Sequence, residues 1–263
     1  MSMRDGALRN DEAYGAHPRH RLDLYLPESE GSERPIFVWF HGGGFVRGDK
    51  QHRANIGAWG AREGFVTVLP NYRLAPACRW PSGAEDVVAV WAWLRANAQH
   101  VGGDAESIVL AGESAGAAHV AAATLMRRLQ PKDWNIAGAA LLSGPYNPRL
   151  EGRARTQFGI ATPDPRNEPY FGTDLAGWDA ASVVDHVDAA PFPLLIAYAE
   201  RDLVQMQVQA GELFARLVSR HGFDPELRFL SAHDHFSAGA SLGTEDTSVS
   251  RELAAFVKRC AAG

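Results

Sequence analysis

The Gly-Glu-Ser-Ala-Gly pentapeptide at residues 112–116 constrains the fold of this chain more than any other stretch. The run before it, 107–111, is short, apolar and rich in β-branched residues, and the run after it, 117–126, favours a helix and lacks Gly and Pro. A strand, a tight turn and a helix in this order expose the hydroxyl of the turn serine, and the flanking glycines allow close backbone approach. The pattern therefore predicts that Ser114 is a nucleophile, and the alternative is a plain turn in which Ser114 only caps the helix.

Further apolar runs alternate with helical patterns along most of the chain. The run 35–40 is apolar on both faces, as expected of a central strand that is covered on two sides. Leucines alternate with polar residues over 20–26, which predicts a half-buried strand with one wet face. The other predicted strands are 64–70, 107–111, 136–142, 192–199 and 227–230. Strands that alternate with helices predict an α/β fold with a mostly parallel central sheet and helices on both faces.

The stretch 147–188 breaks this alternation. It is rich in Pro, Gly and aromatic residues, has no long periodic pattern, and is too long for an ordinary connection. We expect either a small lid-like insertion or irregular packing with short helices. The 263 residues contain no internal repeat and no low-complexity tract, so the simplest interpretation is a single domain, 1–263, with an inserted segment.

Composition limits the expected partners and location of the protein. A net charge of −5 gives no electrostatic reason to expect nucleic acid or an anionic membrane as a partner. Two cysteines, Cys78 and Cys260, make no disulfide framework and favour a reducing compartment. The first six residues lack the apolar segment of a secretory signal, and no apolar stretch reaches the length of a membrane span. We expect a cytoplasmic protein that acts on a small molecule and can form a homodimer.

Polar residues follow several of the predicted strands, at the places where the apolar runs end. They are the glycines 42–44, Ser114, Asp202 and the histidine pair His233 and His235. Because ligands of such sheets bind at the carboxyl ends of the strands, we expect these residues to converge on one edge. Their chain order, Ser then Asp then His, is the order expected of an α/β-hydrolase.

Acyl transfer explains why these residue types belong together. A serine hydroxyl is a weak nucleophile until an imidazole takes its proton, and a carboxylate must orient that imidazole. The carbonyl oxygen becomes an anion, which the N–H of Ala115 at a helix N-terminus and those of a glycine-rich loop can stabilise. Glu200 is the alternative carboxylate to Asp202. The spacing of His233 and His235 also suits a metal, but no further ligand set is evident, so we predict no metal and no cofactor.

Five ordered motifs resemble those of the hormone-sensitive-lipase-like esterases and related compact carboxylesterases of the α/β-hydrolase superfamily. The motifs are His-Gly-Gly-Gly-Phe at 41–45 with Gly-Asp-Lys at 48–50, Asn-Tyr-Arg-Leu-Ala-Pro at 71–76, the pentapeptide at 112–116, Ala-Glu-Arg-Asp at 199–202 and His-Phe at 235–236. The resemblance covers roughly residues 20–260, and the ordered set is far more specific than any one motif.

This resemblance implies a role for each matching position. It implies Ser114, Asp202 and His235 as the catalytic residues and the N–H groups of Gly43, Gly44 and Ala115 as the oxyanion hole. His233 then becomes a surface or supporting residue. Ala77 stands where the lipase-like family often has an acidic residue, and the chain leaves little room for that family's N-terminal helical cap. In both respects the chain resembles the compact relatives of that family, which include kynurenine formamidases.

The function expected from these features is hydrolysis of carboxylic esters of short to medium acyl chain through an acyl-enzyme. The alternative with the same mechanism is an arylformamidase that cleaves N-formylkynurenine or a similar formamide. A non-catalytic small-molecule receptor, such as the gibberellin receptors on this fold, is disfavoured because all three triad positions are filled.

Several other residues receive structural interpretations. We expect His41 to brace the glycine loop, His119 to be packed behind the nucleophile, and Arg73 and Asp86 to form a structural pair. Five aromatic residues line either an acyl or alcohol pocket or the core: Phe45, Tyr146, Phe158, Tyr170 and Phe171.

Overall fold

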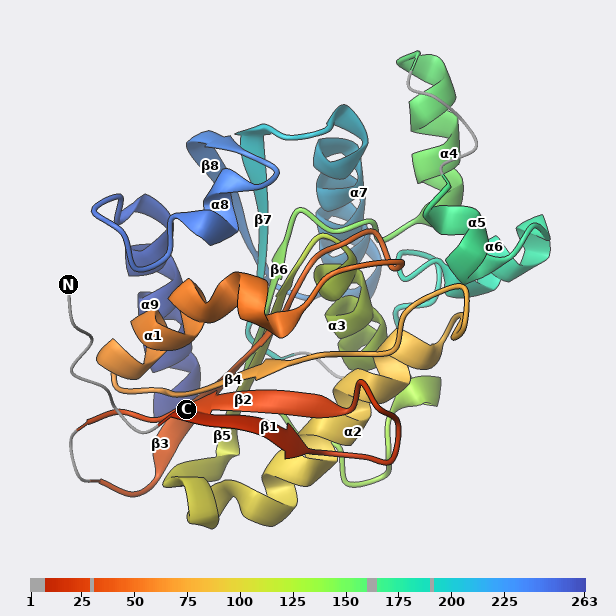
Figure 1. Cartoon of the computed structure of the whole chain (residues 1–263). Coiled ribbons are helices and arrows are strands. Elements are labelled where there is room, and N and C mark those ends of the chain that lie inside the picture. Colours follow the sequence, from red (N-terminus) through yellow and green to blue (C-terminus); the bar gives the residue numbers. More distant parts are fainter. Residues whose placement is uncertain (1–7, 29–30, 160–164, 190–191) are drawn as a thin grey trace.

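The computed structural model describes residues 8–28, 31–159, 165–189 and 192–263. At its centre lies an eight-stranded sheet with the order β1-β2-β4-β3-β5-β6-β7-β8 (Figure 1). The strands are β1 (Leu8–Ala13), β2 (Arg21–Tyr25), β3 (Arg34–Phe40), β4 (Val66–Pro70), β5 (Gly103–Glu113), β6 (Gly138–Leu142), β7 (Leu194–Arg201) and β8 (Glu226–Asp234). The pairs β1–β2 and β2–β4 are antiparallel and the others are parallel. The predicted fold class, an α/β protein with a mostly parallel sheet, is confirmed.

Helices cover both faces of the sheet. The α-helices are α1 (Ala54–Arg62), α2 (Ser82–Asn97), α3 (Ala115–Leu125), α4 (Pro148–Gln157), α5 (Asn167–Phe171), α6 (Leu175–Ala181), α7 (Val204–His221), α8 (Ser237–Ala240) and α9 (Ser248–Ala262). Short 3₁₀ turns are η1 (Lys50–Arg53), η2 (Ala98–Val101) and η3 (Arg127–Leu129). Helices α2, α3 and α7 pack on one face, and α1 and α9 on the other (Figure 1).

Strand β3 shows why the chain forms these layers. Its alternate residues Ile36, Val38 and Phe40 pack under α2, α3 and α7, whereas Phe37 and Trp39 point into the core beneath α1 and α9. A strand buried on both sides needs apolar residues at every position, which is the pattern that the sequence shows. The sheet therefore carries its strand ends to one edge between two helical layers.

The edge of the sheet near the N-terminus corrects one expectation. The polar face predicted for 20–26 is not wet, because Asp23 is only 3% exposed and pairs at 2.8 Å with the buried ammonium of Lys50. Strand β1, which the sequence did not predict, covers this edge, and its Asp11 also pairs with Lys50 at 2.9 Å. Burying a charge is costly without a partner, so these pairs explain how polar residues occupy an interior position.

The described part of the stretch 147–188 contains three short helices, α4, α5 and α6. Helix α4 projects from the body of the molecule at the upper right of Figure 1, and α5 and α6 lie beneath it. Of the two arrangements that the sequence left open, short helices are present in this stretch. Strand β8 extends beyond the predicted 227–230. A count of apolar residues misses the extension, because β8 has the exposed polar residues that are typical of an edge strand.

Candidate active site

The pentapeptide forms the predicted turn between strand β5 and helix α3. Ser114 has φ 52° and ψ −123°, a conformation that L-residues rarely adopt. The N–H of Ser114 donates to the carbonyl of Leu142 at 2.8 Å, which fixes the turn to β6. A Cβ at Gly116 would lie 2.1 Å from the carbonyl oxygen of Phe40, so only glycine lets the helix approach β3 this closely.

The Ser114 hydroxyl does not cap the helix. Its Oγ lies 3.0 Å from Nε2 of His235, and Nδ1 of the same ring lies 2.7 Å from Oδ1 of Asp202. The carboxyl of Asp202 is fully buried and also accepts the N–H groups of Leu203 at 2.9 Å and Ala199 at 3.3 Å. Since Oδ1 accepts from Nδ1, Nε2 is left as the acceptor that faces the serine. Residues 114, 202 and 235, far apart in the sequence, therefore form one hydrogen-bonded line.

The two alternatives raised by the sequence lie elsewhere. Glu200 turns away from the imidazole and accepts the N–H of Ala232 at 2.6 Å and the hydroxyl of Ser231 at 3.1 Å. His233 is not a surface residue: it is buried and bonds Ser248 Oγ at 2.9 Å. Within the ranges that the structure describes, no group of three or more His, Cys, Asp or Glu side chains is placed to hold a metal ion.

The glycine loop lies beside Ser114. Gly43 and Gly44 have φ 141° and 59°, and a Cβ at Gly43 would lie 1.9 Å from the carbonyl oxygen of Arg47. A Cβ at Gly42 would lie 3.1 Å from that of Ser114, which shows how closely the loop approaches the turn. Ala115 is the first residue of α3, where backbone N–H groups have no helical acceptor. The predicted N–H donors therefore come from two segments that meet next to the serine.

Aromatic and histidine side chains brace the glycine loop from behind. His41 donates from Nδ1 to the carbonyl of Gly42 at 2.7 Å and stacks on Tyr72, whose hydroxyl donates to the carbonyl of His41 at 2.8 Å. Burial lowers the pKa of His41 to about 4 and that of His119 to about 3, so both rings are neutral at pH 7. The structural roles expected for these two histidines agree with this packing.

Helix α5 of the inserted stretch packs directly against the loop. Tyr170 stacks on Phe45 with ring centroids 4.6 Å apart, and its hydroxyl accepts the N–H of Gly83 at 3.1 Å. A Cβ on Gly44 would lie 2.3 Å from Cδ of Arg166, so the aliphatic part of the Arg166 side chain packs against this glycine. Of the five aromatic candidates, Phe45, Tyr146 and Tyr170 are buried, Phe171 is half-buried and Phe158 is exposed.

The expected pair of Arg73 and Asp86 is present, with Nε 2.7 Å from Oδ1. Sequence reasoning missed two other charged residues close to the serine. Glu113, the variable position of the pentapeptide, bonds Arg53 Nε at 2.5 Å and the N–H of Gly42 at 3.3 Å. No sequence signal links positions 53 and 113, because their contact exists only after the loop and the strand have folded together.

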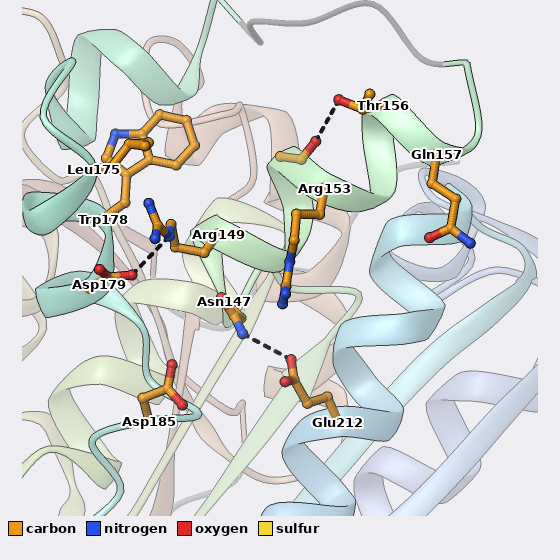
Figure 2. A pocket seen from close by; sticks show the side chains of 11 residues that line it. Asn147, Arg149, Arg153, Thr156, Gln157, Leu175, Trp178, Asp179, Asp185 and Glu212 are labelled. Atoms are coloured by element: carbon orange, nitrogen blue, oxygen red, sulfur yellow. Dashed lines mark hydrogen bonds and ion pairs between the residues drawn. The ribbon is translucent and has the colours of Figure 1, made fainter.

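A cavity of about 820 Å³ opens between helices α4, α6 and α7 (Figure 2). Its lining residues are Asn147, Arg149, Gly152, Arg153, Thr156, Gln157, Leu175, Trp178, Asp179, Asp185 and Glu212. Figure 2 shows two interactions across it, Arg149 with Asp179 at 2.9 Å and Asn147 with Glu212 at 3.0 Å. The hydrogen-bonded line at Ser114 is not part of this cavity. Among the described residues, no helix is both long and apolar enough to cross a bilayer.

Comparisons with known proteins agree with this geometry. Residues 37–237 match a family described as alpha/beta hydrolase fold. A probable isoprenylcysteine alpha-carbonyl methylesterase of Oryza sativa subsp. japonica is 34% identical over 144 residues, which cover 51% of this chain and 34% of that protein. An esterase of Mycobacterium tuberculosis is 35% identical over 103 residues, which cover 35% of this chain and 30% of that protein. The matched segments thus span about a third of these relatives.

Solved structures share the fold at low identity. Esterase B of Lactobacillus rhamnosis has a TM-score of 0.81 at 18% identity, with 97% of this chain and 86% of that chain covered. A thermophilic carboxylesterase from a metagenomic library has a TM-score of 0.78 at 20% identity, with 100% and 90% covered. The family match spans most of the sheet and every motif from the glycine loop to His235. The chain therefore belongs to the α/β-hydrolase fold family.

Proposed function

We propose that this protein is a serine hydrolase that cleaves carboxylic esters of short to medium acyl chain through an acyl-enzyme. The observation that carries the proposal is the line in which His235 lies 3.0 Å from Ser114 Oγ and 2.7 Å from Asp202 Oδ1. The esterase names of the relatives support the choice of an ester as substrate.

The first step is attack of Ser114 on the ester carbonyl. Asp202 fixes the tautomer of His235 by accepting from Nδ1, so Nε2 takes the serine proton as the new C–O bond forms. The buried carboxylate then stabilises the imidazolium, because its negative charge lies next to the ring and is shielded from solvent. The strained turn at Ser114 keeps Oγ on the substrate side of the sheet edge.

The tetrahedral oxyanion lies among the N–H groups of Gly43, Gly44 and Ala115. The N-terminus of α3, a helix of 11 residues, adds a favourable partial charge at the same point. His235 next gives its proton to the leaving alcohol, and a water activated by the same Nε2 hydrolyses the acyl-enzyme. This water attack returns Ser114 and His235 to their starting protonation.

Replacement of Ser114 by Ala tests the proposal. We expect ester turnover to fall by at least about three orders of magnitude, because the remaining groups cannot supply a nucleophile. A matched control is Ser219→Ala on the exposed side of α7, which should keep wild-type turnover. Labelling of the wild-type protein at Ser114 by a fluorophosphonate probe gives the second readout. Unchanged turnover in Ser114→Ala would refute the assignment.

A formamide is the alternative substrate for the same residues. The His-Gly-Gly loop motivates it, whereas the matched relatives are named esterases. A panel of p-nitrophenyl esters from acetate to palmitate, with N-formylkynurenine and an isoprenylcysteine methyl ester beside it, separates the alternatives. A kcat/KM more than tenfold higher for the formamide would replace the ester proposal. A receptor without activity would show neither turnover nor labelling.

We further propose that the stretch 147–188 forms a lid-like part of one domain and limits the size of the acyl chain. Its α5 is held against the glycine loop by Tyr170, which leaves little freedom next to the serine. A steep fall in kcat/KM beyond octanoate supports this limit, and equal rates up to palmitate contradict it. Cytoplasmic location and a homodimer stay predictions, to be tested by fractionation and by light scattering.

A further inference from the structure

We infer that Glu113 is a positioning residue that holds the glycine loop, the serine turn and the histidine-bearing segment together. It lies immediately before Ser114, and its side chain is buried. The inference rests on the proposed function in one respect, since it takes the glycine loop to be the oxyanion hole. Three separate contacts of the same carboxylate carry it.

The first contact is with the glycine loop. Oε1 of Glu113 accepts the N–H of Gly42 at 3.3 Å, at the point where the loop passes closest to Ser114. Gly42 directly precedes Gly43 and Gly44. A shift of Gly42 would therefore move the two N–H donors relative to the serine, and sub-ångström misplacement of such donors weakens their interaction with the oxyanion.

The second contact is with Arg53, the last residue of η1. Its Nε donates to Oε1 at 2.5 Å, and the two side chains are 20% and 8% exposed. Because η1 follows the glycine loop in the chain, this pair ties the far end of the loop to the strand that carries the serine. Loss of one partner leaves the other charge without compensation in a largely buried place, which is far more costly than loss of an exposed pair.

The third contact is with helix α8, which begins two residues after His235. A Cβ on Gly239 would lie 2.3 Å from Oε2 of Glu113, so only glycine permits this approach. Asn55 holds this segment by donating to the carbonyl of Gly239 in α8 at 3.1 Å and to that of Leu242, just beyond the helix, at 3.0 Å. The segment that carries the imidazole is therefore seated on the carboxylate of Glu113 and on the start of α1.

A comparison pair shows what sets this carboxylate apart. Glu106 also bonds an arginine, Arg95, but their side chains are 31% (Arg95) and 63% (Glu106) exposed. The pair lies far from the carboxyl end of β5, where Ser114 follows. Exposed pairs of this kind contribute little. Glu106→Gln is therefore the matched control for Glu113→Gln, since both changes remove one negative charge and keep the shape of the side chain.

The experiment compares an ester with its thionoester in three variants: Glu113→Gln, Gly239→Ala and Glu106→Gln. The sulfur of a thionoester accepts N–H hydrogen bonds poorly, so an intact oxyanion hole favours the oxygen ester. For Glu113→Gln we expect kcat on the ester to fall about 10–100-fold with KM within about twofold, a fraction of the loss of a whole donor. The preference for the ester over the thionoester should shrink by about tenfold.

Gly239→Ala leaves Glu113 in place but pushes its Oε2, so it should give the same change in ester preference. Glu106→Gln should match the wild type in every readout. The rate of fluorophosphonate labelling of Ser114 is measured beside turnover, and we expect it to fall about tenfold in both test variants. Labelling does not depend on the natural substrate, so it decides the inference even if no panel ester is turned over and the proposed ester chemistry fails.

Two results would overturn the inference. One is wild-type ester preference and wild-type labelling in Glu113→Gln and in Gly239→Ala. The other is an equal loss on ester and thionoester together with a lower melting temperature, because that is what a purely structural role predicts. A selective loss of ester preference at an unchanged KM supports the positioning role.

Discussion

The surroundings of Ser114 and the cavity beneath α4 are built in different ways. Around Ser114, parts of β5, β7, β8 and the glycine loop meet, and the polar groups are largely buried with short hydrogen bonds. Around the cavity, most polar groups lie on three helices, and the ion pair of Arg149 with Asp179 is exposed, at 40% and 58%. Buried pairs lock a geometry, whereas exposed pairs contribute at most about 1 kcal/mol. The molecule therefore keeps a fixed geometry around Ser114 beside a region that tolerates change.

Helix α5 connects the two regions. Its Tyr170 stacks on Phe45 of the glycine loop, and Phe171 contacts both Phe45 and Trp178 of the cavity wall, with centroids 5.2 and 6.0 Å apart. A change in the cavity can therefore reach the glycine loop through this small aromatic group. Substitutions on either side of α5 therefore test how sharply the two regions are separated.

Gly43→Ala should have the largest effect. The added Cβ would lie 1.9 Å from the carbonyl oxygen of Arg47, and φ 141° is closed to alanine, so the loop must move. We expect kcat to fall about 10²–10³-fold, as on loss of an oxyanion donor. Steady-state kinetics on p-nitrophenyl acetate measure it.

The matched control is Gly211→Ala in α7, where an added Cβ meets no atom within 4 Å. We expect unchanged kinetics and a gain of about 0.5–1 kcal/mol in the free energy of unfolding, since alanine favours a helix. Equal kinetics in the two variants would mean that the glycine loop does not take part in the reaction.

The free energy of unfolding should also depend on pH, because folding lowers the pKa of His41, the residue that precedes the glycine loop. Its pKa is lowered by burial to about 4, below the ordinary value of 6.5, so the unfolded chain binds a proton more readily than the folded one. The contribution of His41 to the free energy of unfolding is therefore complete above pH 6.5 and is lost as the pH drops toward 4. Between pH 7 and 4.5 we expect His41 to account for a loss of about 2–3 kcal/mol in the free energy of unfolding.

Urea unfolding of the wild type and of His41→Gln at both pH values measures this loss. The variant cannot titrate at position 41, so its stability should fall less on acidification. The buried ring of His119, with a pKa of about 3, keeps part of the acid sensitivity in both proteins. Parallel losses in wild type and variant would contradict the assignment of the acid sensitivity to His41.

Tyr170→Phe tests how α5 connects the two regions, and its expected effect is smaller. The change keeps the stacked ring but leaves the buried N–H of Gly83 without its acceptor at 3.1 Å, which costs about 1–3 kcal/mol. We expect a lower free energy of unfolding and a kcat on p-nitrophenyl acetate within about threefold of wild type, because the ring contact with Phe45 remains. Thermal melts and kinetics measure both, and unchanged stability would show that this hydrogen bond anchors nothing.

The sequence alone predicts the surroundings of Ser114 better than it predicts the rest of the molecule. Central strands such as 35–40 are apolar at every position, and Ser114 and Asp202 each follow an apolar run. His235 follows only the short run 227–230, but the order of the three residues along the chain already predicted that they converge. Strand β1 could not be predicted in this way, because Leu8–Ala13 is mostly polar and is held by pairing with β2. In such segments a partner far along the chain decides the structure.

The buried charges could not be predicted from the sequence for the same reason. Asp23 appeared to lie on a wet face because its partner Lys50 is 27 residues away, and Glu113 appeared to be a variable position because Arg53 is 60 residues away. The helices of 148–181 are short and lack a clear apolar stripe, so neither their bounds nor the cavity that they enclose could be derived from periodicity. Long-range pairing, more than local propensity, is what a single sequence conceals.

Arg149→Ala should have the smallest effect, because Arg149 lies outside the hydrogen-bonded line at Ser114. It removes an exposed ion pair with Asp179, worth at most about 1 kcal/mol, and empties one wall of the cavity without touching α5. We expect kinetics on p-nitrophenyl acetate within about twofold of wild type. A tenfold loss on acetate would contradict the separation, because it would place a weakly held surface arginine among the groups that set the geometry of Ser114.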